Sequence, residues 1–231
     1  MAPHKSYAQI EDDFSAYPHE SNPDPQAFVE LALTKSSLRH HMFSTTGPNS
    51  GPLYAVTTSS PFARAIPAVS LHSTTTRDSP PLGVVWLGFW RKHNIGFRAE
   101  DNEEYFGTKE EMDWLKMFRV NLLNFKEFDF EFEGKSYIWR TLRAAPYGER
   151  PDIELREKGA GGGGETLLAF YKGERRREKL RTWRGVFFLR GKSWSEAREL
   201  KLGAWELVVI MTGLGVVEAA GREAARRKTA G

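Results

Sequence analysis

The chain contains no cysteine in its 231 residues. This absence excludes disulfide bonds, thiol nucleophiles and zinc sites built from cysteine thiolates, although it does not fix the cellular compartment. No nucleophile–base pair and no pair of catalytic acids stands out in the sequence either. We therefore expect a protein that is not an enzyme and that carries no cofactor and no metal.

The N-terminal segment lacks the features of a targeting peptide. It has no apolar stretch and carries acidic residues early, so neither a secretory nor a mitochondrial signal is indicated. Prolines interrupt residues 1–25 without a periodic pattern, and we expect an irregular leader there. The cytoplasm is the expected location, with the nucleus and the periphery of a membrane as alternatives.

Long apolar runs are also scarce, and the main one lies near the C-terminus. Residues 204–228 read as one helix, and Leu207 to Val217 are apolar on every side of it. A helix that is apolar all round has to be surrounded on all sides, so we expect a sheet wrapped around it. A transmembrane helix needs about 20 apolar residues, and this run is about half that long, so we do not expect the chain to be transmembrane. Its glycines predict close approach of the surrounding strands.

Most of the remaining sequence is typical of short strands, which predicts one β domain over residues 26–231. Phe128, Phe130 and Phe132 alternate with acids, the pattern of a strand with one buried face. Thr108 and Glu111 have the spacing of a capping box, which predicts a short peripheral helix over Lys109–Phe118. Regularly spaced strands favour an antiparallel sandwich or barrel. The expected strands cover residues 26–33, 36–44, 53–58, 66–75, 82–90, 94–98, 128–133, 136–143, 153–156, 166–172, 184–189 and 199–202.

We expect the largest aromatic side chains and the middle of the helix to form the core. The residues assigned to it are Trp86, Tyr137, Trp139, Trp205, Val208, Ile210, Leu214 and Val217.

Charge is distributed unevenly along the chain. Up to Gly164 there are 18 basic and 22 acidic residues, and beyond it 15 basic and 8 acidic. This asymmetry suggests an anionic partner on one face. The candidate anion- or lipid-binding residues form one basic run, which could equally be a solvated hairpin tip: Arg175, Arg176, Arg177, Lys179 and Arg181.

Other candidate sites are weaker. The glycine run over 159–164 lacks the lysine of a phosphate-binding loop and is expected to be a linker. His40 and His41 are adjacent, so on a strand they face opposite sides and cannot share a metal ion. The acids between Glu100 and Asp113 lack EF-hand spacing, which favours a solvated loop over a calcium site.

Several features together resemble the tubby C-terminal-like superfamily, which includes tubby proteins, plant LURP-one-related proteins and phospholipid scramblases. They are the many strands, the Tyr137-x-Trp139 pair and a last apolar helix running into Glu-Ala-Ala-Gly-Arg-Glu. The segment SSLRHHMFSTTGPNSGPLYAVTT is similar to a fungal branch of the superfamily, with Leu38, Gly51 and Tyr54 followed by Thr57 in order. The resemblance spans residues 26–228. The acidic segment and the glycine run depart from the compact family pattern.

The resemblance implies a closed barrel of about twelve antiparallel strands around a central C-terminal helix. Tubby domains bind phosphoinositides through basic surface residues, although the corresponding residues cannot be assigned here. We therefore expect a monomeric, non-enzymatic interaction module that docks on anionic phospholipid or on a protein partner. The alternatives are a ligand carrier or enzyme with a barrel-end pocket, and a scramblase-like lipid or calcium function. Nucleic acid is not expected as a partner, because no binding motif is present.

Overall fold

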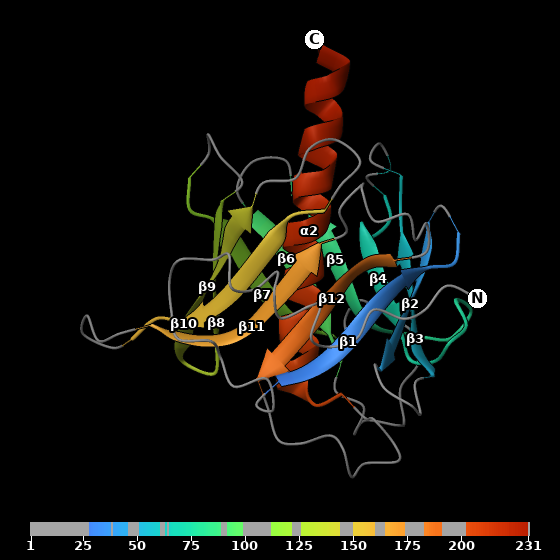
Figure 1. The fold of residues 1–231 in the computed structure, drawn as a ribbon, viewed down its shortest axis with the longest axis horizontal. Helices are drawn as coiled ribbons and strands as arrows, with labels where there is room; N and C mark the ends of the chain where they lie inside the picture. Colours follow the sequence, from blue (N-terminus) through green and yellow to red (C-terminus); the bar gives the residue numbers. More distant parts are fainter. Residues whose placement is uncertain are drawn as a thin grey trace, which may run out of the picture.

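The computed structural model describes residues 28–37, 39–45, 51–60, 63, 65–88, 92–98, 112–121, 126–143, 150–159, 165–173, 183–190 and 202–230. Within these ranges the protein is a closed antiparallel barrel of twelve strands with one C-terminal helix through its centre (Figure 1). The expected leader, residues 1–25, lies outside the described residues. The strands are β1 (Phe28–Lys35), β2 (His40–Thr45), β3 (Pro52–Thr58), β4 (Val69–His72), β5 (Pro81–Leu87), β6 (Lys92–Phe97), β7 (Asp113–Arg119), β8 (Glu127–Phe132), β9 (Lys135–Arg143), β10 (Asp152–Glu157), β11 (Thr166–Gly173) and β12 (Trp183–Arg190).

The barrel is a simple meander in which each strand pairs with the next one along the chain. Pairing of β1 with β12, from Phe28 opposite Arg190 to Thr34 opposite Trp183, closes the sheet. A closed sheet has no edge strand, so the pairing satisfies backbone groups all the way round. The sandwich that the strand pattern also allowed is thereby excluded.

The C-terminal helix, α2 (Ala204–Ala230), runs through the barrel and projects from one end (Figure 1). Its residues from Leu207 to Ala219 are all buried, as expected for a segment that is apolar on every side. The core side chains assigned from the sequence are placed accordingly: Val208 and Ile210 are 0% exposed, Leu214 5% and Val217 3%.

The expectation that this segment is too short to span a bilayer is wrong. By length and composition, Ala204–Arg227 is long and apolar enough to do so. However, 72% of the apolar window is buried inside the protein, so its own strands cover it instead of lipid.

One polar side chain interrupts the apolar helix and meets a polar group of the barrel wall. The indole Nε1–H of Trp139 donates a hydrogen bond of 2.9 Å to Thr212 Oγ1, and both residues are 0% exposed. The Thr212 hydroxyl donates in turn to the carbonyl of Val208 at 2.7 Å. A buried indole N–H needs an acceptor, and Thr212 provides it.

The helix glycines bring the strands close, as the sequence predicts. A Cβ at Gly213 would lie 2.6 Å from Phe187 Cε1, which is closer than two non-bonded carbon atoms can approach. At Gly215 the nearest atoms, of Met117 and Val85, would lie at 3.3 Å. Gly213 therefore marks the tighter contact between α2 and the barrel wall.

The peripheral helix expected over Lys109–Phe118 is wrong in its described part, because Asp113–Arg119 is the strand β7. Leu115, Met117 and Arg119 point inward and are buried, whereas Trp114 and Phe118 lie on the outer face and are exposed. Apolar residues on both faces hide the two-residue period of a strand. Pairing with β6, from Lys92 opposite Phe118 to Phe97 opposite Asp113, fixes the strand.

Two of the tryptophans assigned to the core are only half-buried. Trp86 lies beside Val85, which is 0% exposed and faces the helix, so Trp86 is on the outer side of β5. Trp205 packs at the opposite end of the barrel from the helix C-terminus, with its ring centroid 4.9 Å from that of Tyr137. Tyr137 and Trp139 themselves are buried. The strand expected over 199–202 lies outside the described residues except Leu202, which is not in a strand.

Candidate anion-binding surface

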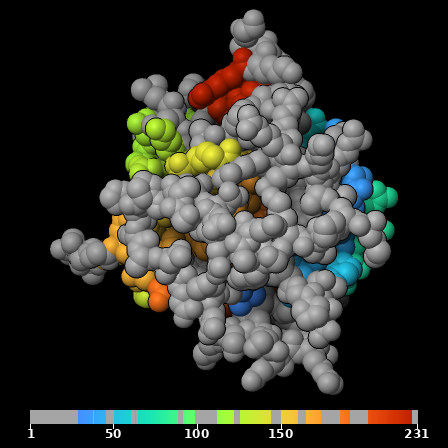
Figure 2. All heavy atoms as spheres, viewed as in Figure 1, coloured from blue at the N-terminus to red at the C-terminus, as the bar shows by residue number. Residues whose placement is uncertain are grey.

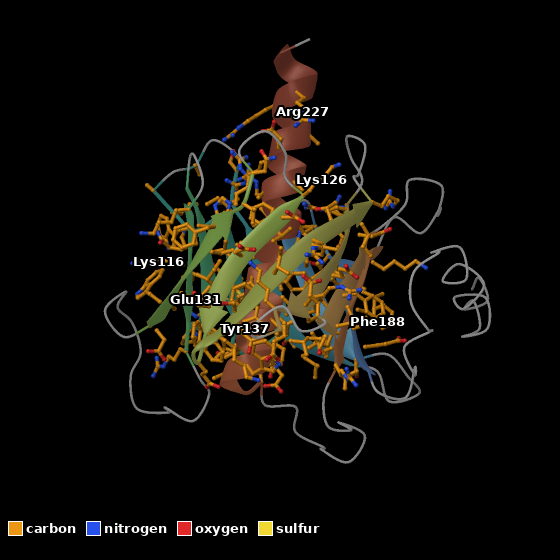
Figure 3. The ribbon with its side chains drawn as sticks, turned by 90° about the vertical axis from the view of Figure 1, so that its left-hand side faces the viewer. Lys116, Lys126, Glu131, Tyr137, Phe188 and Arg227 are labelled. Carbon is orange, nitrogen blue, oxygen red and sulfur yellow. The ribbon has the colours of Figure 1, made fainter. Side chains whose placement is uncertain are left out.

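The meander places alternate connections at opposite ends of the barrel. We call the end from which α2 projects the exit end and the opposite one the far end. The connections β1–β2, β3–β4, β5–β6, β7–β8, β9–β10 and β11–β12 meet at the exit end, because each odd-numbered strand finishes there. Figure 3 shows Lys126 and Arg227 toward this end, and Glu131 and Tyr137 toward the other.

Exposed cations gather at the exit end. Figure 2 shows the C-terminal turns of α2, in red, standing clear of the strands there. We call the exposed cations of this end the basic rim: Arg39, Lys92, Lys126, Arg226 and Arg227. The acids described at this end, Glu127, Asp152, Glu218 and Glu223, are buried or half-buried.

Each of those acids is also held by an arginine. Arg140 contacts Glu127 at 3.3 Å, Arg143 contacts Asp152 at 2.8 Å, and Arg227 contacts Glu223 at 3.1 Å. The remaining acid, Glu218, lies between two arginines. Among the described residues, the outward-facing charge of the exit end is therefore positive.

The far end has the opposite balance among the described residues. Its exposed charges are the acids Asp78, Asp113, Glu131, Glu133 and Glu165 and the cations Arg77, Lys135 and Arg190. A strand of seven residues is roughly 23 Å long. That exceeds twice the Debye length of about 8 Å at physiological salt, so the far-end acids do not cancel the field of the basic rim.

The mouth of the barrel at the exit end contains a buried ionic cluster around Glu218. Arg150 Nη1 donates to Glu218 Oε2 at 3.3 Å, and Arg222 Nε donates to Glu218 Oε1 at 2.9 Å. Arg222 Nη2 also donates to the backbone oxygen and the hydroxyl of Ser59, each at 3.2 Å. The cluster ties α2 to the β3–β4 and β9–β10 connections and carries one excess positive charge.

A second carboxylate, that of Asp152, fixes the position of Arg150 indirectly, through Arg143. Asp152 accepts hydrogen bonds from Arg143 Nε at 2.8 Å and from the backbone N–H of Gly173 at 2.9 Å. Arg143 Nη2 also donates to the Arg150 carbonyl at 3.1 Å. These bonds hold the segment before β10 against the last residue of β11.

The basic run assigned from the sequence lies outside the described residues: Arg175, Arg176, Arg177, Lys179 and Arg181. The chain before it leaves β11 at Gly173, and the chain after it enters β12 at Trp183, so both flanks lie at the exit end. A Cβ at Gly173 would lie 2.2 Å from the Arg150 carbonyl, which places this flank beside the Glu218 cluster.

A small cavity opens beside the same cluster. It measures about 20 Å³ and is lined by polar and apolar side chains, among them His41, Thr58, Arg150 and Glu218. Such a volume holds about one water molecule, which is far below the size of a ligand pocket. His41 is buried here while its neighbour His40 is half-buried on the other face. Among the described residues no group of three His, Cys, Asp or Glu side chains could hold a metal ion.

His93 is a buried imidazole at the exit end. Its Nδ1 accepts a hydrogen bond from the Gly88 N–H at 3.2 Å, so Nε2 carries the proton of the neutral ring. Burial, and secondarily the charge of Arg119, lowers the pKa of His93 to about 4. The ring therefore adds no charge to the basic rim at neutral pH.

Sequence reasoning missed one hydroxyl–imidazole pair. Thr57 Oγ1 lies 3.0 Å from His72 Nε2, and His72 Nδ1 lies 2.8 Å from the Ser79 carbonyl oxygen. Because a carbonyl only accepts, Nδ1 carries a proton and donates it. The connection after β4 is fixed over β3 in the same place, where the Ala55 N–H donates to the Thr74 carbonyl at 2.8 Å. The pair thus secures this connection to the outer face of the barrel.

Comparisons of the chain with protein-family models, with curated proteins and with solved structures give no match. The class is therefore defined by the structure itself: a closed twelve-stranded meander filled by its own C-terminal helix, with a basic exit end.

Proposed function

We propose that the protein is a non-enzymatic interaction module that docks on an anionic phospholipid surface with its exit end. The observation that carries this proposal is the gathering of exposed cations on one end of the barrel, where the described acids are buried or paired. Each basic residue near an anionic membrane contributes about 1 kcal/mol to binding. The basic rim, in which Arg227 also pairs with Glu223 at 3.1 Å, supports affinity of a few kcal/mol after some loss to pairing and screening.

The resemblance to the tubby C-terminal-like superfamily supports the same proposal. Tubby domains bind phosphoinositides through basic residues on the barrel surface, and a phosphoinositide headgroup suits arginine, which chelates phosphate with two N–H groups. The two described residues that flank the basic run, Gly173 and Trp183, both belong to strand ends at the exit end. A peripheral place on a cytoplasm-facing anionic leaflet follows from this proposal.

Vesicle co-sedimentation at moderate salt tests the proposal. The wild-type protein is mixed with neutral phosphatidylcholine vesicles and with vesicles that also contain phosphatidylserine and a phosphoinositide. We expect binding to the anionic vesicles and little to the neutral ones. Equal sedimentation with both would contradict the lipid assignment and favour a protein partner.

Two charge variants locate the binding surface. Arg39→Gln/Lys126→Gln removes two cations from the exit end, and Arg77→Gln/Lys135→Gln removes two from the far end. Both variants have the same net charge. We expect the first to bind anionic vesicles roughly 30-fold more weakly, because about 2 kcal/mol is lost. The second should bind nearly as the wild type does, and equal losses in both would show that the exit end is not the docking surface.

A further inference from the structure

Exposed apolar side chains gather at the same end of the barrel as the exposed cations. Among the described residues the large hydrophobic side chains left exposed are Ile66 (53%), Trp114 (43%), Phe118 (45%), Val120 (45%) and Leu142 (50%). All of them except Trp114 lie at the exit end: Ile66 in the β3–β4 connection, Phe118 and Val120 where β7 finishes, and Leu142 where β9 finishes. A surface that is exposed, apolar and confined to one end of a protein marks an interaction site.

Three of these side chains lie on the same part of the outer face, on β7 and β9 and in the turn after β7, and we call them the apolar rim: Phe118, Val120 and Leu142. The Val120 N–H donates to the Glu127 carbonyl at 3.1 Å, and the Thr141 N–H donates to the Lys126 carbonyl at 2.7 Å. Val120 and Leu142 therefore lie on either side of the start of β8, about 10 Å apart. Phe118 precedes Val120 by one strand repeat on the same outer face.

Cations are interleaved with the apolar rim. Lys92 pairs in register with Phe118 across β6 and β7, and Lys126 lies between Val120 and Leu142. The acids on this part of the outer face are already paired: Glu127 with Arg140 at 3.3 Å and Asp129 with Lys158 at 2.7 Å. A partner that covers this surface has to be apolar and anionic at once.

We propose that the apolar rim inserts into the interfacial layer of an anionic bilayer while Lys92 and Lys126 contact the headgroups. The inference rests on the proposed function and deepens it, because it makes the partner an intact lipid surface and not a soluble headgroup. Lysine stems extend along apolar surface and keep their ammonium groups in the polar layer, which suits this alternation. Soluble inositol phosphates match the cations but leave the apolar rim in water.

The first test separates the apolar contribution from the electrostatic one. Val120→Ser/Leu142→Ser retains every charge, and Trp114→Ser removes a larger exposed apolar side chain about 20 Å further along β7. Binding to phosphatidylserine vesicles is measured at low salt and at a salt concentration that screens charge. We expect the double variant to bind at least tenfold more weakly at high salt, and Trp114→Ser to bind as the wild type does.

The outcomes distinguish the two proposals. Wild-type protein that does not distinguish anionic from neutral vesicles would remove the proposed function itself. If the wild-type protein does distinguish them, and the double variant binds as tightly as the wild type at both salt concentrations, insertion alone would be overturned. A loss in Trp114→Ser as large as in the double variant would overturn the end-on orientation. Circular dichroism and thermal unfolding verify that each variant is folded before binding is compared.

The absence of cysteine permits a direct measurement of insertion. Val120→Cys is labelled with a polarity-sensitive fluorophore, and Thr75→Cys, exposed in the β4–β5 connection at the far end, is the matched control. We expect a blue shift and quenching by brominated lipid at position 120 and no change at position 75. Vesicle-bound protein whose label at position 120 stays in water would overturn the inference.

Discussion

The hydrogen bond between Trp139 and Thr212 allows a sharp test of how much one buried polar contact between the helix and the barrel contributes to stability. Thr212→Val keeps the shape of the side chain and removes its only polar group, so the indole N–H of Trp139 loses its 2.9 Å acceptor. A buried donor left unsatisfied costs about 1–3 kcal/mol. Threonine and valine have similar helix propensities, which adds little to the difference. We expect Thr212→Val to lower the free energy of unfolding by about 2 kcal/mol and the melting temperature by roughly 4–8 °C.

A double-mutant cycle with Trp139→Phe isolates the hydrogen bond from packing. Phenylalanine lacks the N–H, so Thr212→Val should cost well under 1 kcal/mol in that background, giving a coupling of about 1–2 kcal/mol. Thr212→Ser is the matched control, since it retains the hydroxyl and therefore the coupling. Free energies of unfolding come from urea titration. An equal cost of Thr212→Val with and without Trp139 would refute the reasoning.

Two further predictions follow from the core and the exit end. Gly213→Ala places a methyl group 2.6 Å from a ring carbon of the barrel wall and should destabilise the fold by about 1 kcal/mol net, because overpacking exceeds the gain in helix propensity. Gly215→Ala, with 3.3 Å available, should be neutral or slightly stabilising in the same thermal unfolding measurement, and a reversed order would contradict the packing. Because the pKa of His93 is about 4 in the fold and near 6.5 in the unfolded chain, the unfolded state binds the extra proton between these values. Stability is therefore full above pH 6.5 and falls as the pH approaches 4, by on the order of 3 kcal/mol. His93→Gln should flatten this pH dependence in denaturant titrations, and an unchanged slope would show that other groups cause it.

The strands and the central helix could largely be predicted from the sequence, because both depend on local patterns of burial. Phe128 and Phe130 face inward with Asp129 between them, and the middle of α2 is apolar on all sides and buried. β7 could not be predicted in this way. Its outer face carries Trp114 near the far end and Phe118 near the exit end, and these residues give the strand an apolar spacing that resembles one turn of a helix.

The basic rim could not be found by inspecting runs of charge. Its members are separated by up to 188 positions, from Arg39 to Arg227, and only the strand order brings them together. One signal was available, however. In a meander of antiparallel strands, every second connection lies at the same end, so charge summed over alternate connections would have indicated the basic end. The same sum cannot find the Thr57–His72 pair, because it depends on how a connection folds back over the sheet.

The position of α2 after all twelve strands has a consequence for biosynthesis. The ribosome synthesises all twelve strands before the helix that fills the barrel. The sheet cannot close until β12 is available to pair with β1. Until then Trp139, Phe187 and their neighbours have no interior to enter, and the nascent chain exposes the apolar surface that chaperones recognise. Folding of the barrel is thus expected to be complete only after α2, the last of these elements to be synthesised, has left the ribosomal tunnel.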